Sequence, residues 1–326
     1  MALRLAYLGR TVALVEKAVF PRPHIGESLG AGVLPLLDVI GLRTAVERAD
    51  FVPMSGTTVS WAGEMFHSET VGGYQVDRGR FDTVLLDAAR HAGVIVRQPD
   101  CIIRADFCEN QWCLTLRSGG TLEARYLADA GGRGARALLE PANQKTALGN
   151  PTLAMFAYWR GVNVTSAETL IEAGRNHWYW GAPLPDGSFV GCVFVDPLVA
   201  RDTTQYHDLL AESALIGPRL AVSGCSLDGE IRVCDATAYL ENVPITARLL
   251  RAGDAVLSLD PLSSQGVQVA MGTAVHAATV IHTMFDKPER AELAMKFYHQ
   301  RVQDSAQYHR TTAADYYTRQ WESVGG

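Results

Sequence analysis

The sequence of 326 residues lacks the features that mark membrane, secreted and nucleic-acid-binding proteins. No apolar stretch reaches the roughly 18 residues of a transmembrane helix, so we expect no membrane partner. The formal net charge is −6 and no basic run is present, so we expect no nucleic-acid partner. The apolar N-terminal stretch is interrupted by Arg10 and lacks a small-residue cleavage site, so we expect no secretory signal. These absences predict a cytoplasmic protein.

Cysteine is scarce, and its spacing does not indicate a metal site. The six cysteines include no CxxC pair, which favours scattered thiols over a disulfide framework and predicts no bound metal. The chain is 48% apolar and 20% charged, as ordinary globular chains are. Its length suggests about two domains.

One stretch, RAGDAVLSLDPLSSQGVQVAMGTAVHAA at residues 251–278, combines a strand end, a Gly-Asp turn, a polar loop and a helix. The helix is expected to open at about Ser264, with Ser263 and Ser264 as N-cap residues and Pro261 harmlessly ahead of it. Asp254 follows a strand, where open α/β sheets bind ligands. Free N–H groups and small residues at the helix start would let a flat ligand come close. The alternative is a core helix that follows a glycine turn.

The first strand of the chain indicates a dinucleotide-binding fold whose usual opening is missing. Residues 11–15 predict a buried parallel strand that ends in Glu16 and Lys17, and the acid in this place bonds the adenosine ribose in such folds. No strand and GxGxxG turn precede it, so we expect an N-terminally shortened flavoprotein. A surface acid remains the alternative for Glu16. Residues 132–137 match GxGxxA, but no strand-terminal acid follows about twenty residues later.

A second alternative comes from Gly26-Glu27-Ser28-Leu29-Gly30, which matches the GxSxG elbow of serine hydrolases. The elbow requires a strand directly before the serine, and Pro21 and Pro23 stand there instead. A helix from about Ser28 explains the segment better.

Several motifs together resemble FAD-dependent aromatic hydroxylases and flavin-dependent halogenases. They are GDAVLSLDPLSSQG (253–266), RPHIGESL (22–29), VDRGRFD (76–82) and LADAGGRGA (127–135). The resemblance implies an α/β fold with a doubly wound, Rossmann-like FAD-binding domain and an inserted antiparallel β-sheet substrate domain. We assign residues 1–50, 74–145 and 240–285 to the first domain, 51–73 and 146–239 to the second, and 286–326 to a C-terminal helical segment.

The resemblance also implies a cofactor site. Asp254 would bond the ribityl hydroxyls of FAD, the helix mouth would face the isoalloxazine, and Arg78 would reach the phosphate or ribityl chain. A solvated helix-start arginine is the alternative for Arg78. His24, Glu27 and Ser28 would line the site, although a loop or cap role explains each one alone. The predicted cofactor-binding residues are Glu16, Lys17, Arg78, Asp254, Pro261, Ser263, Ser264, Gln265 and Gly266.

The motifs separate two activities. The halogenase motif WxWxIP has a counterpart in Trp178-Tyr179-Trp180-Gly181-Ala182-Pro183, which resembles it with Ala182 in place of isoleucine. The alternative is that Trp178 and Trp180 are simply a pair of core tryptophans. Halogenases need a lysine in the segment that here reads MSGTTVSWAG, and no lysine lies between Ser28 and Gln75. The closest resemblance is to tryptophan-hydroxylating flavoproteins of quinone-cofactor maturation.

We therefore predict an FAD-dependent monooxygenase that hydroxylates an aromatic substrate through a flavin C4a-hydroperoxide. The substrate is an aromatic small molecule or a tryptophan side chain in a protein or peptide, and a separate flavin reductase is a candidate partner. A halogenase and a truncated, non-catalytic remnant of the fold are the alternatives. The sequence identifies no catalytic acid or base.

Overall fold

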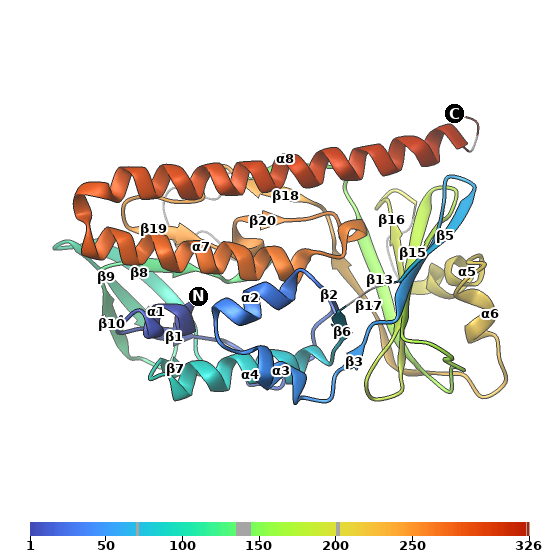
Figure 1. The fold of residues 1–326 in the computed structure, drawn as a ribbon, viewed down its shortest axis with the longest axis horizontal. Helices are drawn as coiled ribbons and strands as arrows, with labels where there is room; N and C mark the ends of the chain where they lie inside the picture. The colour runs from blue at the N-terminus through green and yellow to red at the C-terminus, as the bar shows by residue number, and fades with distance from the viewer. Residues whose placement is uncertain (70–71, 135–144, 200–202, 324, 326) are drawn as a thin grey trace.

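A computed structural model describes residues 1–69, 72–134, 145–199, 203–323 and 325. Figure 1 shows helices and short strands on the left, a tall sheet on the right, and the last helix running along the top from one part to the other. None of the helices in the described ranges has both the length and the apolar character that a bilayer-spanning helix requires.

The tall sheet has seven strands in the order β17-β13-β16-β15-β14-β4-β5, and only the β14–β4 pair is parallel. Segments far apart in the chain meet in it, because β4 and β5 precede the other strands by about a hundred residues. Their bounds are β4 Gly56–Trp61, β5 Glu64–Glu69, β13 Leu153–Arg160, β14 Glu168–Ala173, β15 His177–Pro183, β16 Phe189–Val195 and β17 Ser226–Asp235. The predicted antiparallel sheet is therefore present, with one parallel strand pair, β14–β4, inside it.

The two faces of this sheet bury different apolar sets, because side chains alternate along each strand. On one face, Tyr179 and Phe189 pack against α5 (Tyr206–Ala211) and α6 (Gly217–Leu220). On the other face, Trp178 and Trp180 pack toward loops of the left-hand part.

The left-hand part contains two parallel strand pairs. β1 (Ala13–Val15) pairs with β7 (Ile95–Arg97), and β11 (Leu127–Asp129) pairs with β19 (Leu249–Arg251). No described strand hydrogen-bonds to both pairs. The strand expected over residues 11–15 is shorter than predicted and is not buried, since Ala13 is exposed. Helix α4 (Arg78–His91) follows β6 (Gly73–Gln75) as expected, and Asp77 caps its start.

Shorter elements complete this part. Residues 102–124 form a three-stranded antiparallel meander in the order β10-β9-β8, after which the chain enters β11. The remaining bounds are α1 Ala2–Tyr7, β2 Ser28–Gly30, α2 Val33–Val39, α3 Arg43–Glu47, β3 Val52–Pro53, β8 Ile102–Cys108, β9 Gln111–Leu116, β10 Thr121–Ala124, η1 Gly132–Gly134, β12 Lys145–Ala147, η2 Thr203–Gln205, β18 Tyr239–Glu241, η3 Gly253–Ala255, β20 Leu257–Ser258, η4 Pro261–Ser263 and η5 Pro288–Arg290.

The helix expected from about Ser28 is wrong. Residues 28–30 form β2, which pairs with β6, and the helix begins only at Val33. The pairing with β6 overrides the local helical pattern, as tertiary contacts often do. The serine-hydrolase elbow is therefore not formed, because Ser28 lies inside a strand and not at a strand-to-helix turn.

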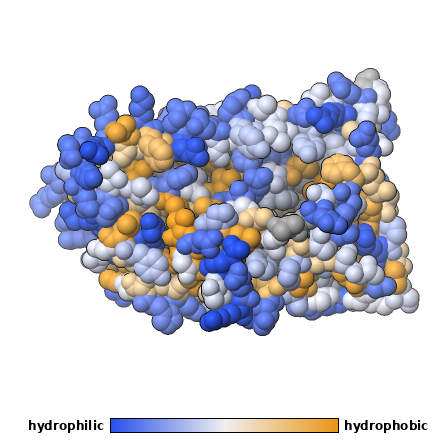
Figure 2. All heavy atoms as spheres, viewed as in Figure 1, coloured by the Kyte–Doolittle hydropathy of each residue, from blue (hydrophilic) through white to orange (hydrophobic). Residues whose placement is uncertain are grey.

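Two long helices cover the left-hand part. α7 (Gly266–Asp286) and α8 (Ala291–Ser323) lie side by side, with Ala277, Ile281 and Tyr298 in one apolar core. The Tyr298 hydroxyl donates a hydrogen bond of 2.6 Å to the carbonyl oxygen of Arg251 at the end of β19. Figure 2 shows apolar side chains at the surface between α2 and α7, where Leu34 and Met271 are only partly buried.

We predict that Tyr298→Phe lowers the free energy of unfolding by about 1 kcal/mol, since it removes one buried hydrogen bond. Tyr298 is 0% exposed. Tyr308→Phe is the matched control, because Tyr308 lies on the same helix and is 63% exposed. Urea unfolding measures both variants, and an equal loss in the two would contradict the prediction.

Candidate functional site

The N-terminus of α7 is open. The helix begins at Gly266, and the backbone N–H groups of Gly266, Val267 and Gln268 have no hydrogen-bond partner among the described residues. Ser264 precedes the helix with a left-handed φ of 50° and is exposed. The helix mouth therefore presents unpaired donors and the positive end of its dipole at the surface.

Neither predicted cap residue caps α7. Ser263 lies in the turn η4, where its Oγ accepts only the Gln265 N–H at 3.3 Å, and Ser264 makes no cap bond. Helix α7 has no side-chain cap; Asp260 instead caps the preceding turn, where its Oδ1 accepts the Leu262 N–H at 2.9 Å and η4 begins at Pro261. An extra turn thus separates the capped segment from the helix, which explains why the predicted start was two residues early.

Asp254 follows β19 in the turn η3, which packs against α7 at Ala270 and Thr273. Gly253 makes the turn with a φ of 62°, and its N–H donates to the Thr273 hydroxyl of α7 at 3.0 Å. The Asp254 side chain is 41% exposed, and its carboxylate accepts no hydrogen bond from the described residues. A carboxylate in such a place is available to an external hydroxyl donor.

Positive charges surround the Asp254 carboxylate. Burial raises the pKa of Asp254, and the charges of Arg133, His24, Arg78 and Lys145 act in the opposite direction. The Arg133 guanidinium is nearest, with Nε 4.0 Å from Oδ2. Arg133 and Arg78 are each also paired with an aspartate, Asp235 and Asp82, both at 3.2 Å, and burial lowers the pKa of His24. Lys145 and the two arginines are therefore the basic groups from which a phosphate-bearing ligand could draw a partner.

Tyr239 organises two of these cations. Arg133 and Lys145 lie 5.2 and 4.0 Å from the centre of its ring, and its hydroxyl donates to the Asp254 carbonyl oxygen. Arg133 also donates to the Thr237 carbonyl oxygen at 2.6 Å. We did not predict these three residues as cofactor-binding. The DAGGR motif was the signal for Arg133; its continuation through residues 135–137 lies outside the described residues.

Arg78 braces the loop ahead of β2. Its guanidinium pairs with Asp82 at 3.2 Å and donates to the carbonyl oxygens of Ile25 and Gly26 at 3.0 and 3.3 Å. Gly26 has a φ of 102°, a backbone conformation that favours glycine, so the loop can bring its carbonyl oxygen to Arg78. Arg78 is therefore engaged with protein groups near Asp254, and its contact with the flavin stays a prediction.

Glu16 and Lys17 lie apart from this group. Glu16 Oε1 accepts the N–H of Ala18 at 2.8 Å, and Lys17 is exposed. No hydrogen bond or ion pair of the described residues joins either one to Asp254 or α7. Their role toward an adenosine ribose remains a prediction.

A buried carboxylate lies between the loop and the tall sheet. Glu27 is 2% exposed; its Oε1 accepts the Tyr158 hydroxyl at 2.7 Å and its Oε2 the Gly26 N–H at 2.8 Å. Burial raises the pKa of Glu27, while these hydrogen bonds act in the opposite direction. A buried acid with a raised pKa is a candidate proton donor.

The polar contact continues through β6. The Ser28 hydroxyl donates to Gln75 Oε1 at 2.5 Å, and Gln75 Nε2 donates to Thr169 Oγ1 at 3.0 Å. Gln75 is 0% exposed. Ser28 is thus a link between β2 and the tall sheet, and His24 does not bond it: His24 contacts only the carbonyl oxygen of Ile25, its neighbour in the chain.

An aromatic surface faces the loops that hold Glu27 and Leu262. Trp178 and Trp180 of β15 share one side of the tall sheet with Trp61 of β4, and Ile25 and Leu262 of the left-hand part pack against them. Trp178 stacks on Phe194 with ring centroids 3.9 Å apart. The WxW pair therefore lies where the two parts of the molecule meet, a common place for a ligand pocket.

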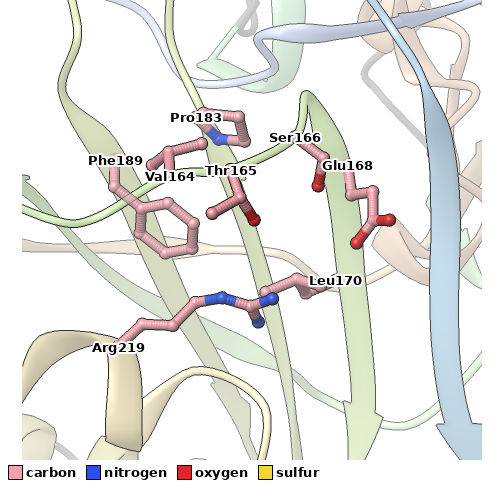
Figure 3. Close-up of a pocket in the computed structure, with 8 residues that line it drawn as sticks. All are labelled: Val164, Thr165, Ser166, Glu168, Leu170, Pro183, Phe189 and Arg219. Carbon is pink, nitrogen blue, oxygen red and sulfur yellow. The ribbon is translucent and has the colours of Figure 1, made fainter.

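The hollow in Figure 3 lies on the opposite face of the sheet. Its volume is about 10 Å³, room for one water molecule, and Leu170, Phe189 and Arg219 are among the residues that line it. Leu170 and Phe189 belong to the cluster that packs against α5 and α6. It is too small for an aromatic substrate.

These residues fit a flavin. The unpaired N–H groups of α7 suit the electron-rich edge of a reduced isoalloxazine, and the unbonded Asp254 carboxylate suits a polyol chain. Nothing lies within 4 Å of a Cβ built on Gly266, so a flat ring system can approach the backbone there.

Comparison with known proteins agrees. Residues 45–322 match the family model described as tryptophan halogenase. The tryptophan 2-halogenase of Chondromyces crocatus is 31% identical over 317 residues, which cover 90% of this chain and 60% of that protein. This chain thus spans about 60% of the length of that relative.

Solved structures share the fold. The myxobacterial chondrochloren halogenase CndH, a variant of FAD-dependent halogenases, superposes with a TM-score of 0.87 at 24% identity, over 97% of this chain and 79% of that one. The peptidyl tryptophan dihydroxylase QhpG, essential for tryptophylquinone cofactor biogenesis, superposes with a TM-score of 0.80 at 26% identity, over 99% of this chain and 73% of that one.

These similarities confirm the predicted resemblance, the α/β fold class with its Rossmann-like domain, and FAD as the cofactor. The domain boundaries and the flavin-contacting residues stay predictions.

We predict that Asp254→Asn weakens FAD binding about tenfold, because it removes the charge from a hydrogen-bond acceptor. Quenching of flavin fluorescence during titration measures the dissociation constant. Asp228→Asn is the control, since Asp228 pairs with Arg160 on the tall sheet. Unchanged FAD affinity in Asp254→Asn would show that Asp254 does not contact the cofactor.

Proposed function

The chain belongs to the tryptophan halogenase family, and from that membership we propose that it is an FAD-dependent oxidoreductase acting on an aromatic ring. Two features carry the proposal: the first N–H groups of α7 are unpaired, and the Asp254 carboxylate, in a turn that packs on the same helix, accepts no hydrogen bond from the described residues. A buried aromatic face lies against the loop ahead of α7. The reaction we infer is hydroxylation, in which one atom of dioxygen enters the ring and the other leaves as water.

The protein's own groups have three tasks in this proposal. Asp254 and the N–H groups of α7 bind and orient the flavin, which supplies activated dioxygen when reduced. The tryptophans of β15 hold the aromatic substrate and exclude water. Glu27, buried and protonated over a wider pH range than an exposed glutamate, holds a proton at Oε between the two parts.

The distribution of lysine supports hydroxylation over halogenation. Met54 opens the segment in which halogenases carry their lysine, and its N–H donates to the Gly73 carbonyl oxygen at 3.2 Å. Of the four lysines in the chain, Lys145 is the one that acts on Asp254, and its amine lies over the Tyr239 ring. It is therefore on the cofactor side of the site.

Halogenation is the second candidate. The family model and the tryptophan 2-halogenase relative favour it. An aromatic small molecule or a tryptophan side chain of a protein would be the substrate in either case. We propose that a separate flavin reductase supplies the reduced flavin and that the reaction takes place in the cytoplasm.

Product analysis distinguishes the two candidates. We expect the full chain, given FAD, a flavin reductase, NADH, oxygen, chloride and a tryptophan-containing peptide or free indole, to add the mass of one oxygen atom. A product with a halogen isotope pattern would establish the second candidate. A wild-type protein that binds no FAD would instead identify a non-catalytic remnant of the fold.

The pH dependence tests Glu27. If its acid form is required, the turnover rate falls as pH rises through its pKa, and burial moves that fall to higher pH than an exposed glutamate would give. We predict that Glu27→Gln lowers turnover about a hundredfold and removes this limb of the pH profile. Glu47→Gln, at an exposed position that pairs with Arg43, is the control. A limb that persists in Glu27→Gln would assign the titration to another group.

A further inference from the structure

The end of α8 contacts the tall sheet at several points. The Trp61 indole donates to the Tyr316 carbonyl oxygen at 2.8 Å, and the Ala62 N–H donates to Gln320 Oε1 at 2.7 Å. Gln320 Nε2 in turn donates to the Gly174 carbonyl oxygen at 3.3 Å. Helix α8 is thus fastened to β4 and to the turn between β14 and β15, on the right of Figure 1.

Tyr317 connects this contact to the loop ahead of α7. Its hydroxyl donates to both oxygens of Asp260, at 3.2 and 3.1 Å. On the sheet side, the Tyr317 ring lies edge-on to Trp61, with ring centroids 5.9 Å apart, and burial raises the pKa of its hydroxyl. Trp61 packs in turn against Trp178, the first tryptophan of the WxW pair, with centroids 6.4 Å apart. Tyr317 thus contacts both the aromatic face and the loop ahead of α7.

Asp260 sets the geometry of that loop. Its Oδ1 accepts the Leu262 N–H, and its carbonyl oxygen accepts the Ser263 hydroxyl at 3.0 Å and the Ser263 N–H at 3.2 Å. These bonds form η4, which ends in the left-handed Ser264 from which α7 opens. The direction of the helix mouth therefore depends on how the Asp260 carboxylate is held.

The charge of Asp260 depends on few groups. Among the described residues, Tyr317 of α8 is the one titratable group that hydrogen-bonds to the Asp260 carboxylate, and no cation pairs with that carboxylate. Within its own turn, Asp260 accepts the N–H of Leu262. Burial raises the pKa of Asp260, while the bonds from Leu262 and Tyr317 act in the opposite direction.

We propose that Tyr317 is a positioning residue for the flavin: its hydroxyl holds Asp260 and so sets the turn that aims α7, while its ring rests against the tryptophans of the substrate sheet. This rests on the proposed function, because it assumes that FAD binds at the mouth of α7. The Tyr317 side chain would then fix the position of a substrate bound against Trp178 relative to the flavin bound at α7.

The test compares Tyr317→Phe with Tyr316→Phe in the full chain. Tyr316 is the matched control, because the structure gives its hydroxyl no bond and its backbone contact with Trp61 survives the substitution. We expect Tyr317→Phe to bind FAD about tenfold more weakly than wild type, because it loses one hydrogen bond to a charged group. Tyr316→Phe should stay within about twofold.

Two further readouts separate positioning from simple packing. The effect of Tyr317→Phe should shrink as pH falls through the pKa of Asp260, because a protonated carboxyl no longer needs the donor. In an Asp260→Asn background, Tyr317→Phe should weaken FAD binding by less than about threefold, since both changes act on one contact. Thermal unfolding of each variant without FAD checks that it folds.

The outcomes are distinct. Wild-type protein that binds no FAD overturns the proposed function together with this inference. Wild-type protein that binds FAD, with Tyr317→Phe equal to Tyr316→Phe, overturns the positioning role alone. A loss in Tyr317→Phe that is independent of pH and additive with Asp260→Asn would assign Tyr317 a packing role and would also overturn it.

Discussion

An α-helix whose first N–H groups have no partner needs an acceptor from outside the chain or from water, and α7 begins in that condition among the described residues. The surrounding structure maintains this arrangement. Asp260 shapes the turn before the helix, and Gly253 turns the chain so that Asp254 follows in a turn packed on α7, where its carboxylate accepts no hydrogen bond from the described residues. Donors and an acceptor are thus held on elements that pack together, as recognition of a ligand with both kinds of group requires.

Much of the fold could be predicted because its signals are local. The Gly-Asp turn identified the end of β19, and the polar loop followed by small residues identified α7. Errors occurred where a partner distant in sequence decided the outcome. Residues 28–30 carry a helical pattern but pair with β6. Ser263 has the chemistry of a cap, but it lies inside the turn η4, which Asp260 caps, and α7 begins at Gly266 without a side-chain cap.

The site shows the same division. Motifs indicated Asp254 and Glu27, because their spacing resembles a known family, whereas no local signal indicated Tyr158. That tyrosine lies 131 residues from Glu27 and occupies an ordinary position in a strand of the tall sheet. Tyr239 and Lys145 likewise meet Asp254 only because β12 and β18 pair next to it. Sequence spacing identified one member of each contact, and the three-dimensional fold was needed to supply the other.

The length of α8 limits how chimeric proteins can be built from this fold. At 1.5 Å per residue its 33 residues form a strut of about 50 Å, one end packed on α7 and the other bonded to Trp61 and Gly174. Helix α8 therefore packs on both parts of the molecule, although it lies outside the sequence segments that form the tall sheet. A chimera that imported a foreign sheet to change the substrate would have to import the matching helix end as well, or it would separate the two parts it was meant to join.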